Sequence, residues 1–412
     1  MESHFRKIHA FGRLHFFLTA LFLFLVFASH CIPDEKIMGH RELSLQLLSE
    51  FPENGCLPGD TPSLKPETEF LTSLNQNPEY STLWNTLTGQ DQGFRWNGMQ
   101  APGRFLLCFF HIGQIRYLCM IAFFMLLFGA AWKISRTYSA PYGFFFLFFF
   151  LWADILPVSW TLPQTGCFLT AFCSILFLCG KKELFREENL HRLLFSFYGI
   201  GAVTAFLDTG TVPVIALSLP LTIAFLSFRD YGPKQKASAV WKSLTGCTLF
   251  WFLGYLLLTI TKWVLTVLFT GSNLFPAYMA RIKEYCFGSS FSAGSLKTML
   301  FENLNGFLSH VGFGKKTLLI LILAVFAIYM ILFFTGHKTR QTCVRNLPLI
   351  FIGMLPFLSY VLAPAHGLME TAVTFRALTA AFWPWMLFFY SMLDLPQIRR
   401  SLHTIWNSAG RN

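Results

Sequence analysis

The sequence predicts an all-α fold: a polytopic transmembrane helix bundle of about ten spans with a helical first extracytoplasmic loop. Three observations support this prediction. Of the 412 residues, 54% are hydrophobic and only 13% are charged, whereas soluble domains carry about 25% charged residues. Apolar runs long enough to cross a bilayer recur along the chain. Lys and Arg gather in alternate segments between these runs, as they do on the cytoplasmic side of membrane proteins.

The first predicted span follows a basic N-terminus. Basic residues within the first 13 positions precede the apolar run 14–32, which indicates a signal-anchor with its N-terminus inside. Val26 and Ala28 also fit a signal-peptidase site, an alternative that leaves the orientation of the remaining chain unchanged.

A polar segment, Pro33 to Arg104, separates the first span from the others. It holds ten of the chain's 21 carboxylates. Residues 40–50 have the apolar spacing of an amphipathic helix, and 64–74 predict a second short helix. Because the segment follows a single crossing, we expect it to lie outside. The predicted organisation is a tail with the first span (1–32), an extracytoplasmic loop with an interfacial segment (33–116), a transmembrane bundle (117–392, with an outer loop at 271–314) and a cytoplasmic tail (393–412).

Nine further spans are predicted from the later apolar runs. Each inner loop between them carries Lys or Arg and both termini fall inside, whereas the outer loop 271–314 fits less well because it holds Arg281, Lys283 and Lys297. Residues 95–116 indicate an interfacial or re-entrant segment that enters the second span. The run 239–270 is too long for one straight crossing, so it is either tilted or enters from an interfacial helix. The ten predicted spans are 14–32, 117–132, 141–158, 163–179, 191–207, 212–228, 239–270, 315–335, 347–362 and 377–392.

Charge and cysteine content exclude several classes of protein. The net charge of +11 does not indicate a nucleic-acid partner, because the basic residues lie mostly in short loops where they set topology. The ten cysteines form no CxxC pair, so neither a zinc site nor a redox motif is indicated. No Gly-rich phosphate loop, HExxH or GxSxG motif occurs. A membrane-dissolved, phosphate-bearing donor therefore fits an enzyme of this composition better than a cytosolic nucleotide.

Ionisable residues near the outer ends of apolar runs are the candidates for chemistry, because charge near lipid is costly. Asp208 lies between two spans, where it is either functional or a helix cap. Lys262 precedes Trp263, so a snorkelling Lys beside an interfacial Trp is the structural alternative. The pair Asp34-Glu35 is either a general base or a hydrated turn.

The last outer loop adds three candidates. His366 and Glu370 are four residues apart and share one face of a helix. That spacing suits a ligand or acid–base site, or a hydrogen-bonded pair that closes the outer face. Arg376 begins an apolar run and needs an anionic partner, which is a protein carboxylate, a lipid headgroup or a substrate phosphate.

Several motifs, taken together and in order, resemble a group of bacterial multi-pass membrane proteins that is similar to the type-C glycosyltransferase superfamily, whose members use polyprenyl-phosphate-linked sugars on the outer face. The collinear order carries the resemblance, since each motif alone is weak. The matching stretches are 64–69, Trp96-Asn97-Gly98, 104–107, Gln114-Ile115-Arg116, 207–213, 251–255, Lys262-Trp263, 271–273 and 366–376.

The resemblance implies transfer of a sugar from a polyprenyl-phosphate donor to an extracytoplasmic cell-envelope glycan or glycolipid, in a bacterial cytoplasmic membrane. It implies that a carboxylate accepts the acceptor's proton, and the candidates here are Glu69, Asp34 and Glu35. The substrate-binding residues that it suggests are Arg104, Arg116, Asp208, Lys262, His366, Glu370 and Arg376. Arg376, with Lys262 or Arg116, would bind the donor phosphate.

Departures from the pattern keep alternatives open. Lys65 replaces the first acidic residue of the loop motif, and Asn97 and Glu370 replace two histidines. A transporter or flippase of lipid-linked saccharides and a catalytically inactive assembly protein are therefore the competing interpretations. The resemblance leaves a divalent cation open, because some superfamily members use one and others do not.

Overall fold

A computed structural model describes residues 2–50, 65–88, 93–209, 212–231, 237–288, 293–309, 315–338 and 340–401. These residues form helices and connecting turns without a β-strand, apart from an isolated bridge between His337 and Leu393. The α-helices are α1 (Glu2–His30), α2 (Asp34–Glu50), α3 (Lys65–Ser73), α4 (Thr82–Thr88), α5 (Gln100–Leu107), α6 (Ile112–Thr137), α7 (Ala140–Trp152), α8 (Leu156–Trp160), α9 (Leu162–Leu178), α10 (Leu190–Leu207), α11 (Ile215–Tyr231), α12 (Ala237–Thr270), α13 (Phe275–Phe287), α14 (Ala293–Ser309), α15 (Lys315–Thr335), α16 (Arg340–Asn346), α17 (Pro348–Leu362), α18 (Pro364–Met369), α19 (Thr371–Thr374) and α20 (Thr379–Met392); three short 3-10 helices are η1 (Lys182–Phe185), η2 (Glu187–Asn189) and η3 (Phe375–Leu378).

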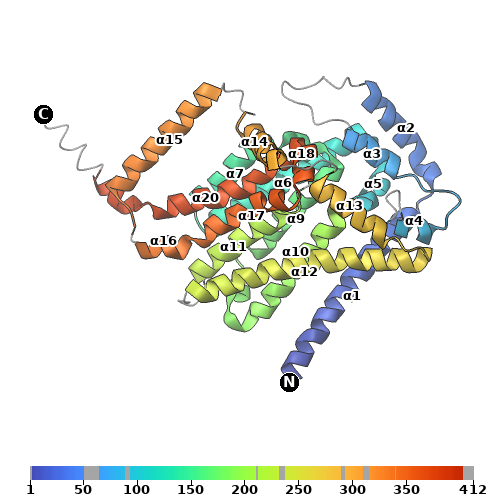
Figure 1. Cartoon of the computed structure of the whole chain (residues 1–412), viewed down its shortest axis with the longest axis horizontal. Coiled ribbons are helices and arrows are strands. Elements are labelled where there is room, and N and C mark those ends of the chain that lie inside the picture. The colour runs from blue at the N-terminus through green and yellow to red at the C-terminus, as the bar shows by residue number, and fades with distance from the viewer. Residues whose placement is uncertain are drawn as a thin grey trace.

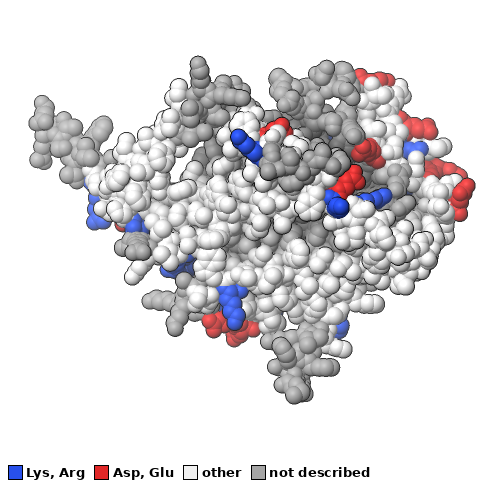
Figure 2. Space-filling view, in the orientation of Figure 1, with Lys and Arg blue, Asp and Glu red and all other residues white. Residues whose placement is uncertain are grey.

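Five helical segments of the described chain are long and apolar enough to cross a membrane, and they identify a multi-pass membrane protein. They are His9–His30, Ile112–Thr137, Glu187–Leu207, Ser238–Thr270 and Gln341–Leu362, and the shorter apolar helices are Ala140–Trp152, Leu162–Leu178 and Leu323–Thr335. In Figure 1 the start of α1 and helix α16 lie toward the bottom and lower left of the view, whereas α2 to α5 and α13 lie at its right. Figure 2 shows a broad surface without charged side chains between these two ends. We call the end that holds α2 to α5 and α13 the α2–α5 end.

Two predicted boundaries differ from the observed helices. The predicted span 141–158 is broken into α7 and α8, because Asp154 between them has a positive φ of 44° that a right-handed helix cannot contain. The stretch 95–116 holds α5 and the first residues of α6, which begins at Ile112 with His111 as its N-cap. Residues 237–270 form one continuous helix, α12, that is about 50 Å long at 1.5 Å per residue.

The closest helix packing joins α10 and α12, and it depends on two glycines. A Cβ on Gly201 would clash with the backbone carbonyl of Trp251, and a Cβ on Gly254 would clash with that of Tyr198. Small residues that let two backbones approach are typical of membrane helix pairs. This contact fixes α10, which ends beside Asp208, against the middle of α12, where Tyr255 lies.

The phenylalanine run of α7 is divided between core and surface. Phe146 and Phe150 are fully buried in the main hydrophobic cluster, whereas Phe144 is 63% exposed. By composition alone the whole run is apolar enough to face lipid. Helical periodicity instead turns every third or fourth ring inward, where it packs against Phe172 of α9.

Candidate functional site

Two adjoining cavities lie at the α2–α5 end of the molecule. The larger has a volume of about 360 Å³, and the smaller, of about 140 Å³, shares Tyr285 and His366 with it. The larger is lined by Phe94, Arg95, Arg281, Glu284, Tyr285, His366 and Glu370. The smaller is lined by Asp208, Val212, Pro213, Val214, Tyr255, Tyr285, Ser359, Tyr360, Ala363, His366 and Thr374. Figure 2 shows cationic and anionic side chains side by side on the surface over α13.

Residues 94–98 are positioned by hydrogen bonds to the end of α10 and to the interior of α12. The Trp96 indole donates to the Leu258 carbonyl at 3.0 Å, and the Gly98 amide donates to the Phe206 carbonyl at 2.9 Å. Asn97 between them has a φ of 51°, in the left-handed region that turns the chain sharply. Arg95 Nη1 donates to the Thr209 carbonyl at 2.6 Å, which orients its side chain toward the cavity.

Asp208 closes α10 and is buried, with 6% of its surface exposed. Its backbone amide still bonds the Thr204 carbonyl, so the residue is the C-cap of the helix. Its side chain turns into the smaller cavity, where Oδ2 accepts a hydrogen bond from the Tyr255 hydroxyl at 2.7 Å and Cys167 Sγ lies 3.7 Å from Oδ1. A carboxylate in this position can accept a proton or hold a sugar hydroxyl.

His366 and Glu370 both line the larger cavity, although they do not pair through a continuous helix. Glu370 ends α18 and is exposed, while the His366 ring stacks on Tyr285 with 4.6 Å between ring centres. Burial raises the pKa of Tyr285 to about 12, and the charge of Arg95 acts in the opposite direction. Tyr285 therefore remains a neutral hydroxyl beside the imidazole at physiological pH.

Arg104 and Asp34 meet each other at the base of α2, away from the residues that line the cavities. Arg104 Nη2 donates to Asp34 Oδ1 at 2.7 Å and to the Ile32 carbonyl at 2.6 Å, while Nε and Nη1 donate to the carbonyls of Ser29 and Leu74. Arg104 is fully buried. These contacts tie the end of α1 to α2, α3 and α5, while Glu35 is exposed on the first turn of α2.

Arg116 also contacts a protein carboxylate. Its guanidinium bonds both oxygens of Glu67, with Nε donating to Oε1 at 3.1 Å. Glu67 is buried, whereas Glu69 is exposed on the same helix, α3. The carboxylate that the loop buries is thus Glu67, two residues before the predicted base, and neither of them lines the cavities.

Lys262 and Arg376 are both buried within the fold. Lys262 Nζ donates to the Thr86 carbonyl at 2.9 Å and lies 5.2 Å from the centre of the Trp96 ring. Arg376 Nε donates to the Asp154 carbonyl at 2.8 Å, and its Nη2 lies 3.6 Å from the Asp154 carboxylate. Burial lowers the pKa of Arg376 to about 10 and Asp154 raises it, so the guanidinium stays charged at neutral pH.

The structure therefore brings three of the ten predicted site residues to one place, namely Asp208, His366 and Glu370. It adds Arg95, Tyr255, Arg281, Glu284 and Tyr285, which sequence reasoning missed. One signal pointed to Arg281: the loop 271–314 carries more basic residues than an outer loop should. Tyr255 lies in the matching stretch 251–255, although that motif assigned it no role, and for Tyr285 no pattern distinguishes a cavity tyrosine from any other aromatic residue.

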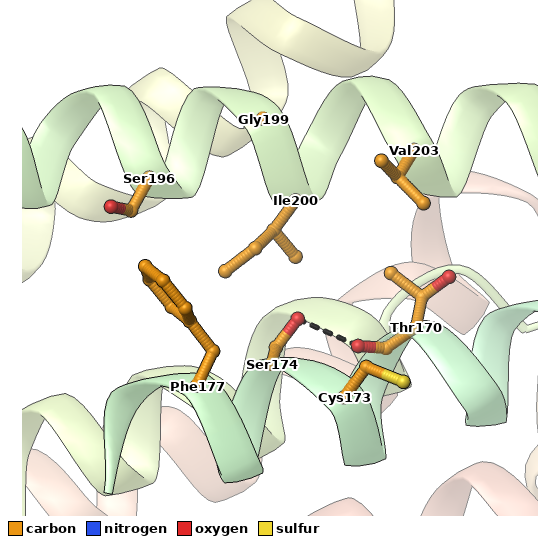
Figure 3. Close-up of a pocket in the computed structure, with 8 residues that line it drawn as sticks. All are labelled: Thr170, Cys173, Ser174, Phe177, Ser196, Gly199, Ile200 and Val203. Atoms are coloured by element: carbon orange, nitrogen blue, oxygen red, sulfur yellow. Dashed lines mark hydrogen bonds between the residues drawn. The ribbon is translucent and has the colours of Figure 1, made fainter. Parts of the chain in front are cut away.

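A third hollow, of about 300 Å³, lies between α9 and α10 (Figure 3). Phe177 and Ile200 reach into it from opposite helices, and the Ser174 hydroxyl bonds the Thr170 carbonyl at 2.6 Å. The lining residues are Thr170, Cys173, Ser174, Phe177, Ser196, Gly199, Ile200 and Val203. None of them carries a charge, so this hollow suits contact with apolar groups and not acid–base chemistry.

The described residues contain no group of three or more His, Cys, Asp or Glu that could hold a metal ion. Comparison with known proteins gives no further assignment: no family model, curated protein or solved structure matches this chain.

Proposed function

We propose that this protein is a membrane glycosyltransferase, similar to the type-C superfamily, that transfers a sugar from a polyprenyl-phosphate donor to an extracytoplasmic cell-envelope glycan or glycolipid. In this proposal the chain crosses a bacterial cytoplasmic membrane about ten times, with both termini inside. The α2–α5 end, with its cavities, faces outward and takes the donor from the surrounding lipid.

One observation carries the proposal: four distant chain segments supply polar side chains to the adjoining cavities at the charged end of an apolar helix bundle. Arg95, Asp208, Tyr285 and His366 represent these segments. Buried polar groups near lipid are costly, so their convergence supports a functional role. A cavity of this size, with several convergent polar groups and aromatic walls, is typical of a small-molecule site.

The chemistry assigned to the site is a single displacement at the anomeric carbon. The acceptor hydroxyl forms the new C–O bond, the bond to the phosphate oxygen breaks, and the phosphate leaves with the electron pair. A carboxylate takes the hydroxyl proton. Because Glu69, Asp34 and Glu35 do not line the cavities, the proposal gives this role to Asp208, whose second oxygen the Tyr255 hydroxyl holds in place. None of these steps uses a metal ion.

His366 and Glu370 are assigned to acceptor or sugar binding. Both line the larger cavity, and Glu370 is exposed at its surface, where an acceptor from the aqueous side would enter. The His366 ring, stacked on Tyr285, presents its edge to the cavity as a hydrogen-bonding group.

The proposal is tested with membranes that contain the protein and a radiolabelled polyprenyl-phosphate sugar. Transfer of label to an envelope fraction is expected for the wild-type chain and is expected to fall at least about a hundredfold in Asp208→Asn, the usual scale for losing an acid–base group. Lys283→Gln, on an exposed position of α13 that does not line either cavity, is the control. Unchanged transfer in folded Asp208→Asn and His366→Ala proteins would contradict the assignment, and movement of donor across the bilayer without transfer would favour a flippase.

A further inference from the structure

The larger cavity gathers two cationic side chains around one aromatic ring. The guanidinium carbon of Arg95 lies 5.9 Å from the centre of the Phe94 ring, and that of Arg281 lies 5.7 Å from the same ring. Arg95 also lies 5.0 Å from the centre of the Tyr285 ring. The shared ring places two arginines from distant segments, before α5 and on α13, on one wall of the cavity.

Their surroundings fix the direction in which these arginines can bind a ligand. An arginine packed over an aromatic ring keeps its N–H groups at the edge of the guanidinium plane, in a fork that matches two oxygens of a phosphate. The bond from Arg95 to the Thr209 carbonyl, at 2.6 Å, further restricts its rotation. A preorganised pair loses less conformational entropy on binding than two flexible surface side chains.

The charge balance of the cavity favours an anion in its inner part. The two carboxylates that line the cavity, Glu284 and Glu370, are exposed, whereas Arg95 and Arg281 are half-buried. Among the residues that line the larger cavity, the charges least screened by water are therefore positive, and the buried carboxylate of Asp208 lies in the adjoining cavity. His366 lies beside them in the lining of the cavity.

We propose that Arg95 and Arg281 together form a phosphate-binding site. The phosphate chemistry follows from the geometry alone, whereas its assignment to the phosphate of a polyprenyl carrier rests on the proposed function. The residues that the resemblance suggested for the donor phosphate, Arg376 with Lys262 or Arg116, do not line this cavity.

The experiment measures ligand binding by purified full-length protein in nanodiscs, without any sugar transfer. The ligands are undecaprenyl phosphate, phosphatidylglycerol, inorganic phosphate and undecaprenol, which lacks the phosphate. The informative variant is Arg281→Gln, because Arg95 also bonds the backbone of residue 209 and its replacement could disturb the fold. Lys283→Gln removes the same charge from the same helix at an exposed position that does not line the cavity, so it controls for net charge.

We expect at least one phosphate ligand to bind the wild-type protein and Lys283→Gln equally, and to bind Arg281→Gln about tenfold more weakly or worse, the loss of one charge-assisted contact. The ligand that shows this difference identifies the source of the phosphate: the polyprenyl carrier, a phospholipid headgroup or free phosphate. Equal binding by Arg281→Gln and Lys283→Gln for all three phosphates, or equal affinity for undecaprenol and its phosphate, would overturn the proposal.

The same variants separate this inference from the proposed function. Phosphate binding that depends on Arg281, without any sugar transfer by the wild-type protein, would leave the binding site intact and refute the transferase. Sugar transfer by Arg281→Gln with an unchanged KM for the donor would refute the phosphate site and leave the transferase intact.

Discussion

Replacing Gly201 by alanine tests the packing of α10 against α12, the helix pair that supports the candidate site. A Cβ at Gly201 would clash with the Trp251 carbonyl oxygen and would lie 2.8 Å from its carbonyl carbon. Non-bonded carbon atoms prefer a separation of about 3.5–4.0 Å, so the two backbones must separate by roughly 1 Å. Neither contact atom belongs to a flexible side chain that could move aside.

The magnitude follows from two opposing effects. Overpacking in a close-packed interior costs about 1–3 kcal/mol, and a backbone-to-backbone clash belongs at the upper end of that range. Replacing glycine by alanine inside a helix raises the free energy of unfolding by about 1 kcal/mol through the higher helix propensity of alanine. We therefore expect Gly201→Ala to lower the free energy of unfolding by about 2 kcal/mol.

Gly199→Ala is the matched control on the same helix. A Cβ at Gly199 meets nothing within 4 Å, so only the gain in helix propensity, about 1 kcal/mol, remains. The free energies of unfolding of the two variants should thus differ by about 3 kcal/mol. Titration of protein in mixed micelles with SDS, followed by tryptophan fluorescence, measures this difference. Equal stability of Gly199→Ala and Gly201→Ala would refute the packing of α10 against α12 described above.

Three further predictions concern the α2–α5 end. Arg104→Ala should lower the free energy of unfolding by about 3 kcal/mol, because three backbone carbonyls lose a donor. Asp34→Asn should lower it by less than about 1 kcal/mol, because Asp34 is partly exposed. Limited proteolysis of residues 34–107 should be faster in Arg104→Ala than in Asp34→Asn, and the reverse order would contradict Arg104 as the structural link. Glu67→Gln should destabilise the protein by about 1–3 kcal/mol and Glu69→Gln by less than about 0.5 kcal/mol, since only Glu67 is buried against a guanidinium; thermal unfolding in detergent compares them, and equal melting temperatures would contradict the pairing. Cleavage after Ala28 should not occur, because the peptide bond lies inside a helix whose end is held by neighbouring segments; intact mass spectrometry of an N-terminally tagged chain should show the tag retained, and its loss would disprove the prediction.

Local patterns anticipated much of the helical framework. Apolar runs at 117–132 and 191–207 fall within α6 and α10, and the run 14–32 lies in α1 except for its last two residues, because burial in lipid requires long apolar helices whatever the neighbouring segments are. The segment predicted as a single span, 141–158, is interrupted at Asp154. Nothing in its apolar composition reveals that Asp154 adopts a left-handed conformation and contacts Arg376 from a segment more than 200 residues away.

The sequence by itself determined that this protein is helical and apolar enough to cross a membrane, since both properties depend on composition and on spacing within a turn or two. It also placed Asp208, His366 and Glu370 among the candidates, because charge beside lipid is unusual at any one position. Which charges face a cavity was decided only by the tertiary structure. Arg104 is satisfied by backbone carbonyls, while Arg281 lines the cavity beside Phe94, and both outcomes depend on segments that meet through folding. The sequence therefore shows where a charge lies beside apolar runs, whereas only the fold shows which distant segments surround it.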